Sequence, residues 1–542
     1  MPSKVEDLSV LVVESHDTMR NQLRGILAQS GITRMSAASS AAMAVRRLRE
    51  TRFDIILCEY HLGEGQNGQH FLEDIRLHQL IPLSTIFIMV TGERSYERVM
   101  GAAELAPNDY LLKPFAAENL RERLERALNK REAFLPVYKL IEAGNTARAA
   151  SECEACEAKY AAYAIDFLRL RAQLLIGLGR PEEALALYQQ ILARRSVPWA
   201  KLGLAKTHFM IGELEQARDE LTELITQNAQ FVDAYDWLAK TQEALGSIEE
   251  AHEALAKAAT LSPHALQRQR RIGEIELDLG QNEAAEKRLA TVLRQSKYSD
   301  FRDPEDHVRL VKAQLGSGSA ERARETLRDL ERSMKGQPKA DLCQAVCAAM
   351  VFTREGDTRQ ARAAAERAAA LMGPETKPSL QLKKEITQVC LEQGLESEAA
   401  EVAMDIMRNS ADEREVDAVR GMLTRMGRAE LGEALASRLR SDVRDTMSEG
   451  AALARSGDHA GSVRHFMDAV QKMPGNALVL YNASLALLKY VEHSGWRDDY
   501  AEEARNLIER LHVQDPGNAK LGALYTYYEG LQQMHQTAAK RA

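Results

Sequence analysis

Short runs of aliphatic and β-branched residues alternate with amphipathic segments over the first 130 residues of the chain. Five of these runs have the composition of buried strands, namely Leu8–Val13, Arg34–Ala38, Phe53–Cys58, Thr85–Val90 and Asp109–Leu112. Segments with helical spacing follow them, at Asp17–Ser30, Ser40–Arg52, Gln69–His78, Ser95–Leu105 and Ala116–Arg131. The alternation predicts a doubly wound parallel α/β sheet over residues 1–130, with ligand-binding residues at the carboxyl ends of its strands.

Beyond this region the pattern is helical throughout, and a glycine recurs every 33 to 38 residues, at Gly144, Gly179, Gly212, Gly246, Gly280, Gly318, Gly356 and Gly394. An alanine stands five residues after each glycine, at Ala149, Ala184, Ala217, Ala251, Ala285, Ala323, Ala361 and Ala399. Glycine permits a tight turn between two helices, and small side chains let the helices approach closely. The period indicates stacked helix–turn–helix units that bury each other's apolar faces.

This glycine and alanine pattern resembles the tetratricopeptide repeat (TPR), and we expect about eight units over residues 132–426. Residues 427–542 keep the period more loosely, so we expect further degenerate units there and a closing helix from Asn518 to Ala542. Pro136 is expected to break any continuation of the last helix of the α/β domain, because proline lacks the N–H that a helix interior requires. The predicted architecture is an N-terminal α/β domain followed by an all-α TPR superhelical solenoid.

Composition narrows the functional classes. The chain of 542 residues has a net charge of −8, which argues against a simple basic nucleic-acid-binding protein. No apolar run is long enough to span a membrane, and the six cysteines are too few for a disulfide framework. We therefore expect a cytoplasmic protein that binds neither nucleic acid nor membrane.

Acids, hydroxyls and a lysine follow the predicted strands. They are Glu14 and Ser15 after the first strand, Glu59 after the third, Thr91 after the fourth and Lys113 after the fifth. Together with the sequence DYLLKPF at positions 109–115, they resemble the receiver domain of response regulators, the input module of bacterial two-component signalling. The resemblance implies a flavodoxin-like (βα)5 fold, with a phosphoryl acceptor at position 59, Mg²⁺ beside the acids after the first strand, and phosphoryl oxygens held by Thr91 and Lys113.

Two positions depart from the family's pattern. Glu59 replaces the acceptor aspartate, and Ser15 replaces the second acid of the metal-binding pair. The loss of a carboxylate weakens a Mg²⁺ site, and the extra methylene of Glu59 moves its carboxylate outward by about one bond length, ~1.5 Å. Phosphoryl transfer depends on positioning and charge. We therefore predict a non-enzymatic pseudo-receiver without a cofactor, in which Glu59 is either an active mimic of the phosphorylated state or an inert relic.

The alternative is a phosphorylatable response regulator that binds Mg²⁺ through Glu14, Glu59 and the backbone of His61. In either case the resemblance assigns Tyr110 as the switch aromatic of the family, although a half-buried tyrosine of an edge strand fits the position nearly as well. It also implies a histidine kinase or another signalling protein as a partner, and a homodimer formed through the receiver.

In TPR arrays the first helix of each unit lines the inner groove. The residues expected there by repeat position are Arg169, Trp199, Lys206, Phe209, Met210, Lys240 and Arg270. This mixture of cations and aromatic groups suits a protein partner with acidic and apolar residues. Cys153 and Cys156 lack a second cysteine pair, so we expect them to pack in the core. The G-x-G-x-x-G sequence at positions 63–68 follows the third strand rather than the first, which favours a loop over a dinucleotide site.

Overall fold

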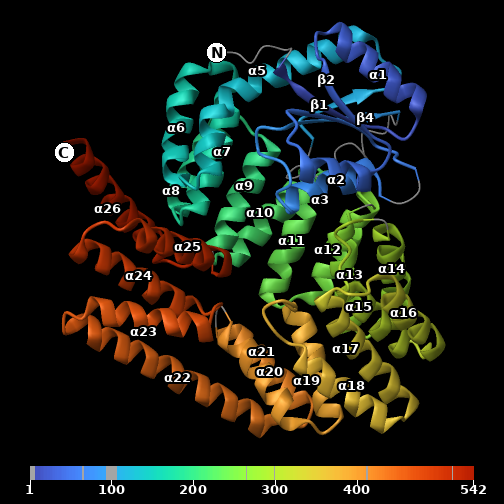
Figure 1. Ribbon diagram of the computed structural model, residues 1–542, viewed down its shortest axis with the longest axis vertical. Coiled ribbons are helices and arrows are strands. Elements are labelled where there is room, and N and C mark those ends of the chain that lie inside the picture. The colour runs from blue at the N-terminus through green and yellow to red at the C-terminus, as the bar shows by residue number, and fades with distance from the viewer. Residues whose placement is uncertain are drawn as a thin grey trace. The chain divides into compact units, whose positions relative to one another are not determined.

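The computed structural model describes residues 7–63, 66–92, 107–263, 265–297, 299–410, 413–515 and 517–541 (Figure 1). It begins with a five-stranded parallel sheet in the order β2-β1-β3-β4-β5. The strands are β1 (Ser9–Val13), β2 (Arg34–Ala38), β3 (Ile55–Glu59), β4 (Ile86–Thr91) and β5 (Asp109–Leu112). All five predicted strands are confirmed. The helix expected at Ser95–Leu105 lies outside the described residues.

Helices cover both faces of this sheet (Figure 1). They are α1 (Asp17–Gln29), α2 (Ala41–Glu50), α3 (Gly68–Leu77) and α5 (Ala117–Glu142). Successive side chains of a strand point to opposite faces, so Val10 and Val12 pack in one cluster with Leu23 of α1 and Leu120 of α5. Leu11 and Val13 belong to the other cluster, with the buried residues of α2 and α3. The sheet is thus buried on both sides, as its nearly continuous apolar strands require.

The rest of the described chain is helical and folds into consecutive antiparallel hairpins. Its elements are α6 (Thr146–Lys159), η2 (Ala161–Tyr163), α7 (Ala164–Gly177), α8 (Pro181–Arg194), α9 (Pro198–Met210), α10 (Leu214–Gln227), α11 (Val232–Leu245), α12 (Ile248–Leu261), α13 (Leu266–Asp278), α14 (Asn282–Ser296), α15 (Glu305–Gly316), α16 (Ala320–Ser333), α17 (Pro338–Glu355), α18 (Thr358–Ala370), α19 (Leu380–Glu392), α20 (Glu396–Arg408), α21 (Glu413–Arg425), α22 (Ala429–Arg455), α23 (His459–Lys472), α24 (Ala477–Ser494), α25 (Asp498–Gln514) and α26 (Leu521–Arg541). The predicted fold class, an α/β domain followed by an all-helical repeat array, is confirmed.

The recurring glycines and alanines have the roles that their spacing predicts. All eight glycines have φ between +63° and +87°, a left-handed conformation that glycine adopts without a steric cost. All eight alanines have an exposed fraction of 0%, which leaves no room for a larger side chain between the paired helices. Gly203 on α9 also lies at a close approach of two helices, because a Cβ there would lie 2.3 Å from the ring of Tyr188 on α8.

The last helix of the α/β domain continues past the predicted boundary at residue 130. The expected break at Pro136 is wrong, because α5 runs without interruption from Ala117 to Glu142 with the proline inside it. A proline inside a helix removes one hydrogen bond, and its ring crowds the carbonyl group one turn back. The neighbouring residues Ala133, Phe134 and Val137 are buried, and their packing holds the helix together across the missing bond.

The described chain divides into two compact units. The first joins Met1–Leu175 with Pro181–Gly318, so it contains the α/β domain and the first hairpins. The second joins Ile176–Arg180 with Ser319–Ala542. The domain limits expected from sequence, at residues 130 and 426, stay predictions. Across the described ranges, no helix combines the length and the apolar character needed to cross a membrane.

Candidate functional site

The candidate site lies where the parallel strands end. Glu14 directly follows β1, Glu59 is the last residue of β3, Thr91 is the last residue of β4, and Lys113 directly follows β5. The carboxyl ends of parallel strands meet at one edge of a sheet, so four segments distant in sequence deliver their polar groups to one place. The structure therefore brings these four predicted residues to one edge.

Lys113 joins the two acids of this edge. Its Nζ donates to Oε2 of Glu14 at 3.0 Å and also donates to Oε2 of Glu59. The remaining carboxylate oxygens accept from the backbone, Oε1 of Glu14 from the N–H of His16 at 2.9 Å and Oε1 of Glu59 from the N–H of His61 at 3.2 Å. All four carboxylate oxygens thus already accept a hydrogen bond. The exposed fractions are 0% for Glu14 and 6% for Glu59, so this network is buried.

The protonation of the network follows from these contacts. Burial acts to raise the pKa of Glu14, but the His16 N–H and the Lys113 ammonium outweigh it and hold that pKa below its usual value. Burial acts to lower the pKa of Lys113, but hydrogen bonds to Glu59 and Glu14 raise it. Burial, with the nearby acids, raises the pKa of the Cys58 thiol well above its usual range, so this cysteine stays protonated and inert.

The other predicted receiver residues surround this network. Ser15 is half-buried, and its Oγ lies 3.2 Å from Nδ1 of His16. Thr91 is 2% exposed, and its carbonyl oxygen accepts from the backbone N–H of Lys113 at 2.7 Å. Tyr110 is half-buried against the α2–α3 side of the core, where burial raises its pKa to about 12. It is therefore a neutral side chain at neutral pH.

The glycine-rich loop behind Glu59 has a packing role at its end. Gly68 begins α3, and a Cβ there would lie 2.4 Å from the carbonyl oxygen of Glu59. The backbone N–H of Gly68 donates to the carbonyl oxygen of Tyr60 at 2.7 Å. Glu64 and Gly65 lie outside the described residues. The final glycine of the G-x-G-x-x-G sequence therefore lets α3 approach β3, a role that needs no nucleotide.

The residues present do not fit a Mg²⁺ ion in this arrangement. Mg²⁺ requires an octahedral set of oxygen ligands, usually anchored by carboxylates. Here each carboxylate oxygen of Glu14 and Glu59 already accepts from an N–H, and the Lys113 ammonium lies between the two acids. No group of three metal-ligating side chains occurs among the described residues. We therefore derive no chemical step through a metal.

Several predicted groove residues form an aromatic and basic cluster on α9 and α11. Nζ of Lys206 lies 4.7 Å from the ring centre of Trp237, and Nζ of Lys240 lies 4.5 Å from the same ring. Phe209 meets Trp237 edge-to-face, with ring centres 5.6 Å apart. Burial lowers the pKa of Lys206 to about 8. The sequence analysis missed Trp237, although its position three residues before Lys240 places both on one helix face.

The remaining predicted groove residues are held by other contacts. The guanidinium of Arg169 lies 5.4 Å from the ring centre of Trp199. Met210 is half-buried at the end of α9. Arg270 on α13 forms a bidentate ion pair with Asp306 on α15, with Nε–Oδ1 and Nη2–Oδ2 distances of 2.8 Å. The structure thus separates the predicted set into an aromatic cluster, a stacked arginine and an arginine engaged in joining two hairpins.

The segment between α14 and α15 contacts the α/β domain within the first unit. Oγ of Ser299 donates to Oδ2 of Asp74 on α3 at 2.8 Å. The ring of Phe301 stacks on His78, with ring centres 3.9 Å apart. Arg49 of α2 pairs with Asp300 at 3.3 Å. The described side chains of this connection thus contact α2 and α3 of the α/β domain.

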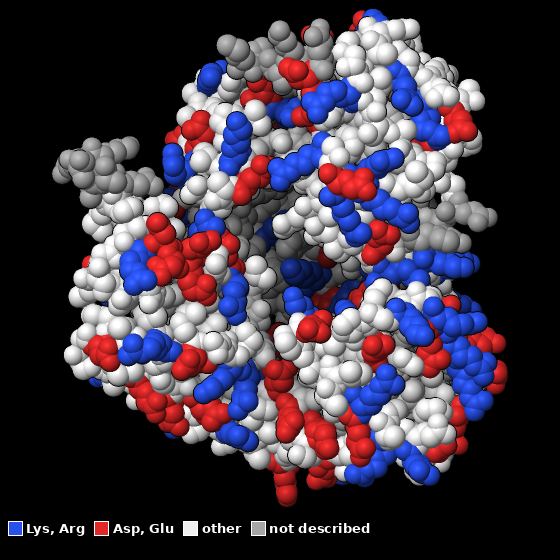
Figure 2. All heavy atoms as spheres, viewed as in Figure 1, with Lys and Arg blue, Asp and Glu red and all other residues white. Residues whose placement is uncertain are grey.

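The cysteines support the packing role expected from their pattern. All six are free and buried. Burial raises the pKa of the Cys153 thiol to about 12, which removes the thiolate that metal binding or redox chemistry would need. Acidic and basic side chains are interspersed over the face shown in Figure 2, so that view presents no continuous basic field for a nucleic acid.

A five-stranded parallel α/β domain with acids and a lysine at one edge, followed by helical hairpins, defines a signalling receiver joined to a repeat array. Comparison with family models agrees. Residues 10–125 match the response regulator receiver domain, and residues 175–241 and 232–264 match tetratricopeptide repeats. The chain thus carries a receiver domain of the two-component signalling family at its N-terminus, followed by TPR repeats.

Three similar proteins each align with less than a quarter of this chain. The chain is 26% identical over 125 residues to chemotaxis protein CheY-3 of Vibrio cholerae, covering 23% of this chain and 95% of that protein. It is 26% identical over 123 residues to chemotaxis protein CheY of Pseudomonas aeruginosa, covering 23% of this chain and 98% of that protein. Among solved structures, the receiver domain of NtrX from Brucella abortus has 24% identity and a TM-score of 0.21, covering 22% of this chain and 98% of that chain.

Proposed function

We propose that this protein is a non-enzymatic signalling regulator whose receiver works without a phosphorylation cycle and whose repeats bind a protein partner. The observation that carries the proposal is the bridge from Lys113 to both Glu14 and Glu59. The lysine that would hold a phosphoryl group in a receiver is already engaged by a permanent carboxylate. Its ammonium therefore has an anionic partner at all times.

Two further features support a fixed state. Ser15 supplies no charge where the family has its second metal-binding acid, so a divalent cation is held less strongly. Glu59 is 6% exposed, and both of its oxygens accept hydrogen bonds, so attack on an incoming phosphoryl group would first require breaking a buried ion pair. On this proposal Glu59 is an active mimic of the phosphorylated state rather than a relic.

The partner is a protein segment with acidic and apolar side chains. Lys206 and Lys240 flank Trp237 in the aromatic and basic cluster of α9 and α11, and such rings and cations suit a carboxylate next to an apolar group. The receiver itself is proposed to dock a signalling protein such as a histidine kinase, or a second copy of this chain. The expected cytoplasmic location stays a prediction.

The test of the receiver is phosphorylation of the full chain by acetyl phosphate with Mg²⁺, followed by intact mass measurement. We expect no 80 Da adduct on the natural sequence. The double variant Ser15→Asp with Glu59→Asp restores the acid and the acceptor of the family pattern, so it serves as the positive control and should gain the adduct. An adduct on the natural chain that is lost in Glu59→Ala would contradict the proposal and establish the phosphorylatable alternative.

The test of the mimic is the effect of the bridge on binding. Glu59→Gln keeps the size of the side chain but removes its charge, so we expect it to change partner affinity or the oligomeric state measured by light scattering. Trp237→Ala with Lys240→Ala should reduce capture of the same partner while leaving the receiver intact. If Glu59→Gln alters neither property, Glu59 is an inert relic and the repeats act without the receiver.

A further inference from the structure

The α/β domain contacts the hairpins of the first compact unit at places that are far apart along the array. At one of them α5 packs on α7, where the ring of Phe134 stacks on that of Phe167 with centres 3.9 Å apart and Lys130 pairs with Asp166 at 2.8 Å. At another, α2 and α3 contact the segment between α14 and α15. The helices α8 to α13 lie between these places along the chain.

This distant contact constrains the repeat array in a way that packing between neighbours does not. In a solenoid each unit packs only on the next, so the curvature is the sum of small rotations between neighbours. The hydrogen bond from Ser299 to Asp74 joins residues 225 positions apart and bypasses the hairpins between them. Because α5 belongs both to the α/β domain and to the first hairpin, the domain spans the arc from α7 to α14 and holds its curvature.

The contact at the far end of this arc depends mainly on one aromatic ring. Phe301 is half-buried, stacks on His78 of α3 and packs against the α2–α3 side of the core. The guanidinium of Arg49 lies 5.8 Å from the centre of the same ring. The side chains of the ion pair between Arg49 and Asp300 are 51% and 25% exposed, and ion pairs at such a surface contribute little. A small and largely polar contact of this kind can open without unfolding either side.

Glu73 of α3 lies beside charged groups of the repeats without a cation of its own. Its Oε1 accepts from Gln69 at 3.1 Å, and among the described residues it forms no ion pair. Arg268 of α13 acts on it, but this guanidinium already donates to both carboxylate oxygens of Asp236 on α11 at 2.7 Å. Burial, together with the charges of Asp74 and Asp236, raises the pKa of Glu73 to about 7. The contact therefore becomes less favourable once Glu73 ionises.

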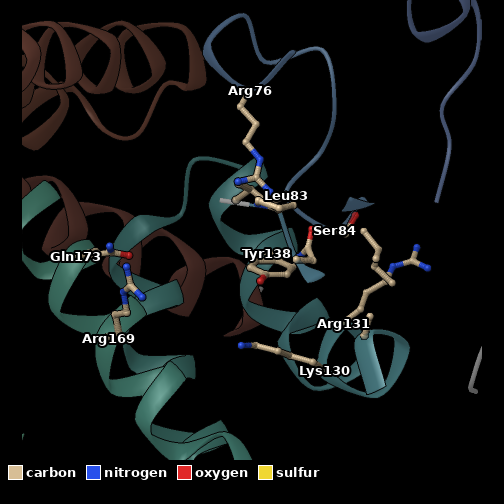
Figure 3. Close-up of a pocket in the computed structure, with 12 residues that line it drawn as sticks. Arg76, Leu83, Ser84, Lys130, Arg131, Tyr138, Arg169 and Gln173 are labelled. Atoms are coloured by element: carbon tan, nitrogen blue, oxygen red, sulfur yellow. The ribbon is translucent and has the colours of Figure 1, made fainter. Parts of the chain in front are cut away.

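A cavity at the near end of the arc leaves room for movement. It has a volume of about 580 Å³, and its lining includes Arg76 of α3, Tyr138 of α5, and Arg169 and Gln173 of α7 (Figure 3). Packed interiors hold their elements in one arrangement, but here α3 and α7 meet across open space. The α/β domain can therefore shift against α7 without breaking a packed core, while the stacked rings of α5 and α7 hold the two parts together.

The constrained arc carries the cations of the proposed groove. Arg169 of α7, Lys206 of α9 and Lys240 of α11 are on successive hairpins, so the curvature sets the spacing of these side chains. At the α13 end, burial raises the pKa of Asp74, and the charge of Arg270 opposes that shift. The acids of α3 thus lie beside a cation of the groove, where they repel the acids of an incoming partner.

We propose that the α/β domain is a releasable brace on the repeats, and that release of α3 from the α14–α15 segment lets the arc change its curvature and admits an acidic partner to the groove. The brace itself is independent of the proposed function, but its effect on the groove rests on that function. In the braced state the acids of α3 oppose an acidic segment beside α13. The partner therefore binds more tightly once α3 is released.

The first test measures the arc by double electron–electron resonance between nitroxide labels on the full chain. The labels attach to Gln190→Cys on α8 and Lys287→Cys on α14, both exposed, because all six native cysteines are buried. We expect one narrow distance distribution at pH 6 and a broader, shifted one in Phe301→Ala. Tyr500→Ala is the matched control and should change nothing, since its ring also carries an arginine, 4.6 Å away, but lies in the second unit. A broad distribution in the natural sequence, or none of this change in Phe301→Ala, would refute the brace.

The second test raises the pH of the labelled chain. The groups around Glu73 are Gln69 and Asp74 on its own helix, Asp236 on α11 and Arg268 on α13. Because the Glu73 pKa is raised to about 7 from 4.5, the brace is strongest at low pH and weakens as pH rises. The released fraction should grow by up to about tenfold between pH 6 and pH 8. Glu73→Gln keeps the size of the side chain but cannot ionise, so its distribution should stay narrow, and broadening that persists in this variant would refute the role of the α3 acid.

The third test connects the brace to binding. The probe is a fluorescein-labelled peptide with the sequence of residues 66–80, which carries the acids and apolar residues of α3. By fluorescence polarisation we expect it to bind Phe301→Ala several-fold more tightly than the natural chain, and we expect a peptide with both acids replaced by amides to bind neither. Equal affinity for the two chains, or no binding to either, would overturn control of the groove by the brace. If Trp237→Ala with Lys240→Ala leaves partner capture unchanged, the proposed groove fails, but the distances of the first test still decide whether the brace exists.

Discussion

Replacement of Lys113 by alanine is the sharpest test of the receiver pocket. In the natural chain the ammonium lies between two acids, of which Glu14 has an exposed fraction of 0% and Glu59 of 6%, while the Lys113 side chain is 21% exposed. Lys113→Ala leaves both carboxylates buried and without their cation. Removing one partner of a buried ion pair costs about 3–5 kcal/mol. Because Lys113 retains some solvent contact, we expect the low end, about 3 kcal/mol.

Hydrogen-exchange mass spectrometry on peptides covering β3 and β4 measures this cost locally. It suits the chain because an array of many units need not unfold in two states. A loss of about 3 kcal/mol corresponds to roughly 100-fold faster exchange in those strands at pH 7.5. Lys130→Ala is the matched control, since its pair with Asp166 is 46% and 44% exposed and should be worth less than about 1 kcal/mol.

The pH dependence has a definite sign. In the natural chain the pKa of Glu14 is held below its usual value, so its contribution to stability is present above the unfolded pKa and is lost as pH falls. In Lys113→Ala the two buried acids lose their cation, so protonating them at lower pH no longer breaks an ion pair and instead removes the cost of burying an uncompensated charge. The difference between the two chains should therefore shrink between pH 7.5 and 5. A difference below tenfold at pH 7.5, or one that does not change with pH, would refute the bridge.

Three further predictions concern other parts of the first unit. Gly203→Ala should destabilise α8 and α9 by about 1–3 kcal/mol, measured by hydrogen exchange in those helices, because the new Cβ would meet the Tyr188 ring. Arg270→Ala should cost about 1.5–3 kcal/mol, measured by hydrogen exchange in α13 and α15, because it leaves the carboxylate of Asp306, 1% exposed, with Arg309 as its remaining cation. Glu73→Gln should flatten the pH dependence of stability between about pH 4.5 and 7. Burial raises the Glu73 pKa from 4.5 to about 7, so the folded state binds the proton more tightly and stability falls as pH rises through that window.

Each of these has a result that would contradict it. Gly25→Ala on α1 meets no atom within 4 Å, so it should be neutral or stabilising, and an equal loss there would mean a general effect of glycine replacement. If Arg270→Ala combined with Asp306→Ala is no more stable than Arg270→Ala alone, the weakened pairing of the Asp306 carboxylate is not the cause of the loss. A Glu73→Gln chain that keeps the natural pH profile would assign the titration to another group.

The sequence predicts the elements well because their signals are local. The strands are apolar and β-branched runs, and the repeat positions are fixed by glycines that need a left-handed φ and by alanines that face a neighbouring helix. The helix break predicted at Pro136 does not occur, because the packing of Ala133, Phe134 and Val137 outweighs the tendency of proline to end a helix. This tertiary packing is not visible in a short stretch of sequence.

The positions of the residues at the strand edge can be predicted once the parallel strands are known. Parallel strands deliver Glu14, Glu59 and Lys113 to one edge whatever lies between them. Which of these acids pairs with Lys113 depends on side-chain geometry, which the strand positions alone do not fix.

The unbroken helix α5 fixes the rotational phase between the sheet and the first hairpins. Its 26 residues extend for about 39 Å at about 1.5 Å per residue. With about 3.6 residues per turn, a single inserted residue in its exposed middle would turn everything beyond it by about 100° around the helix axis. The number of residues in this helix therefore determines which side of α7 faces the receiver.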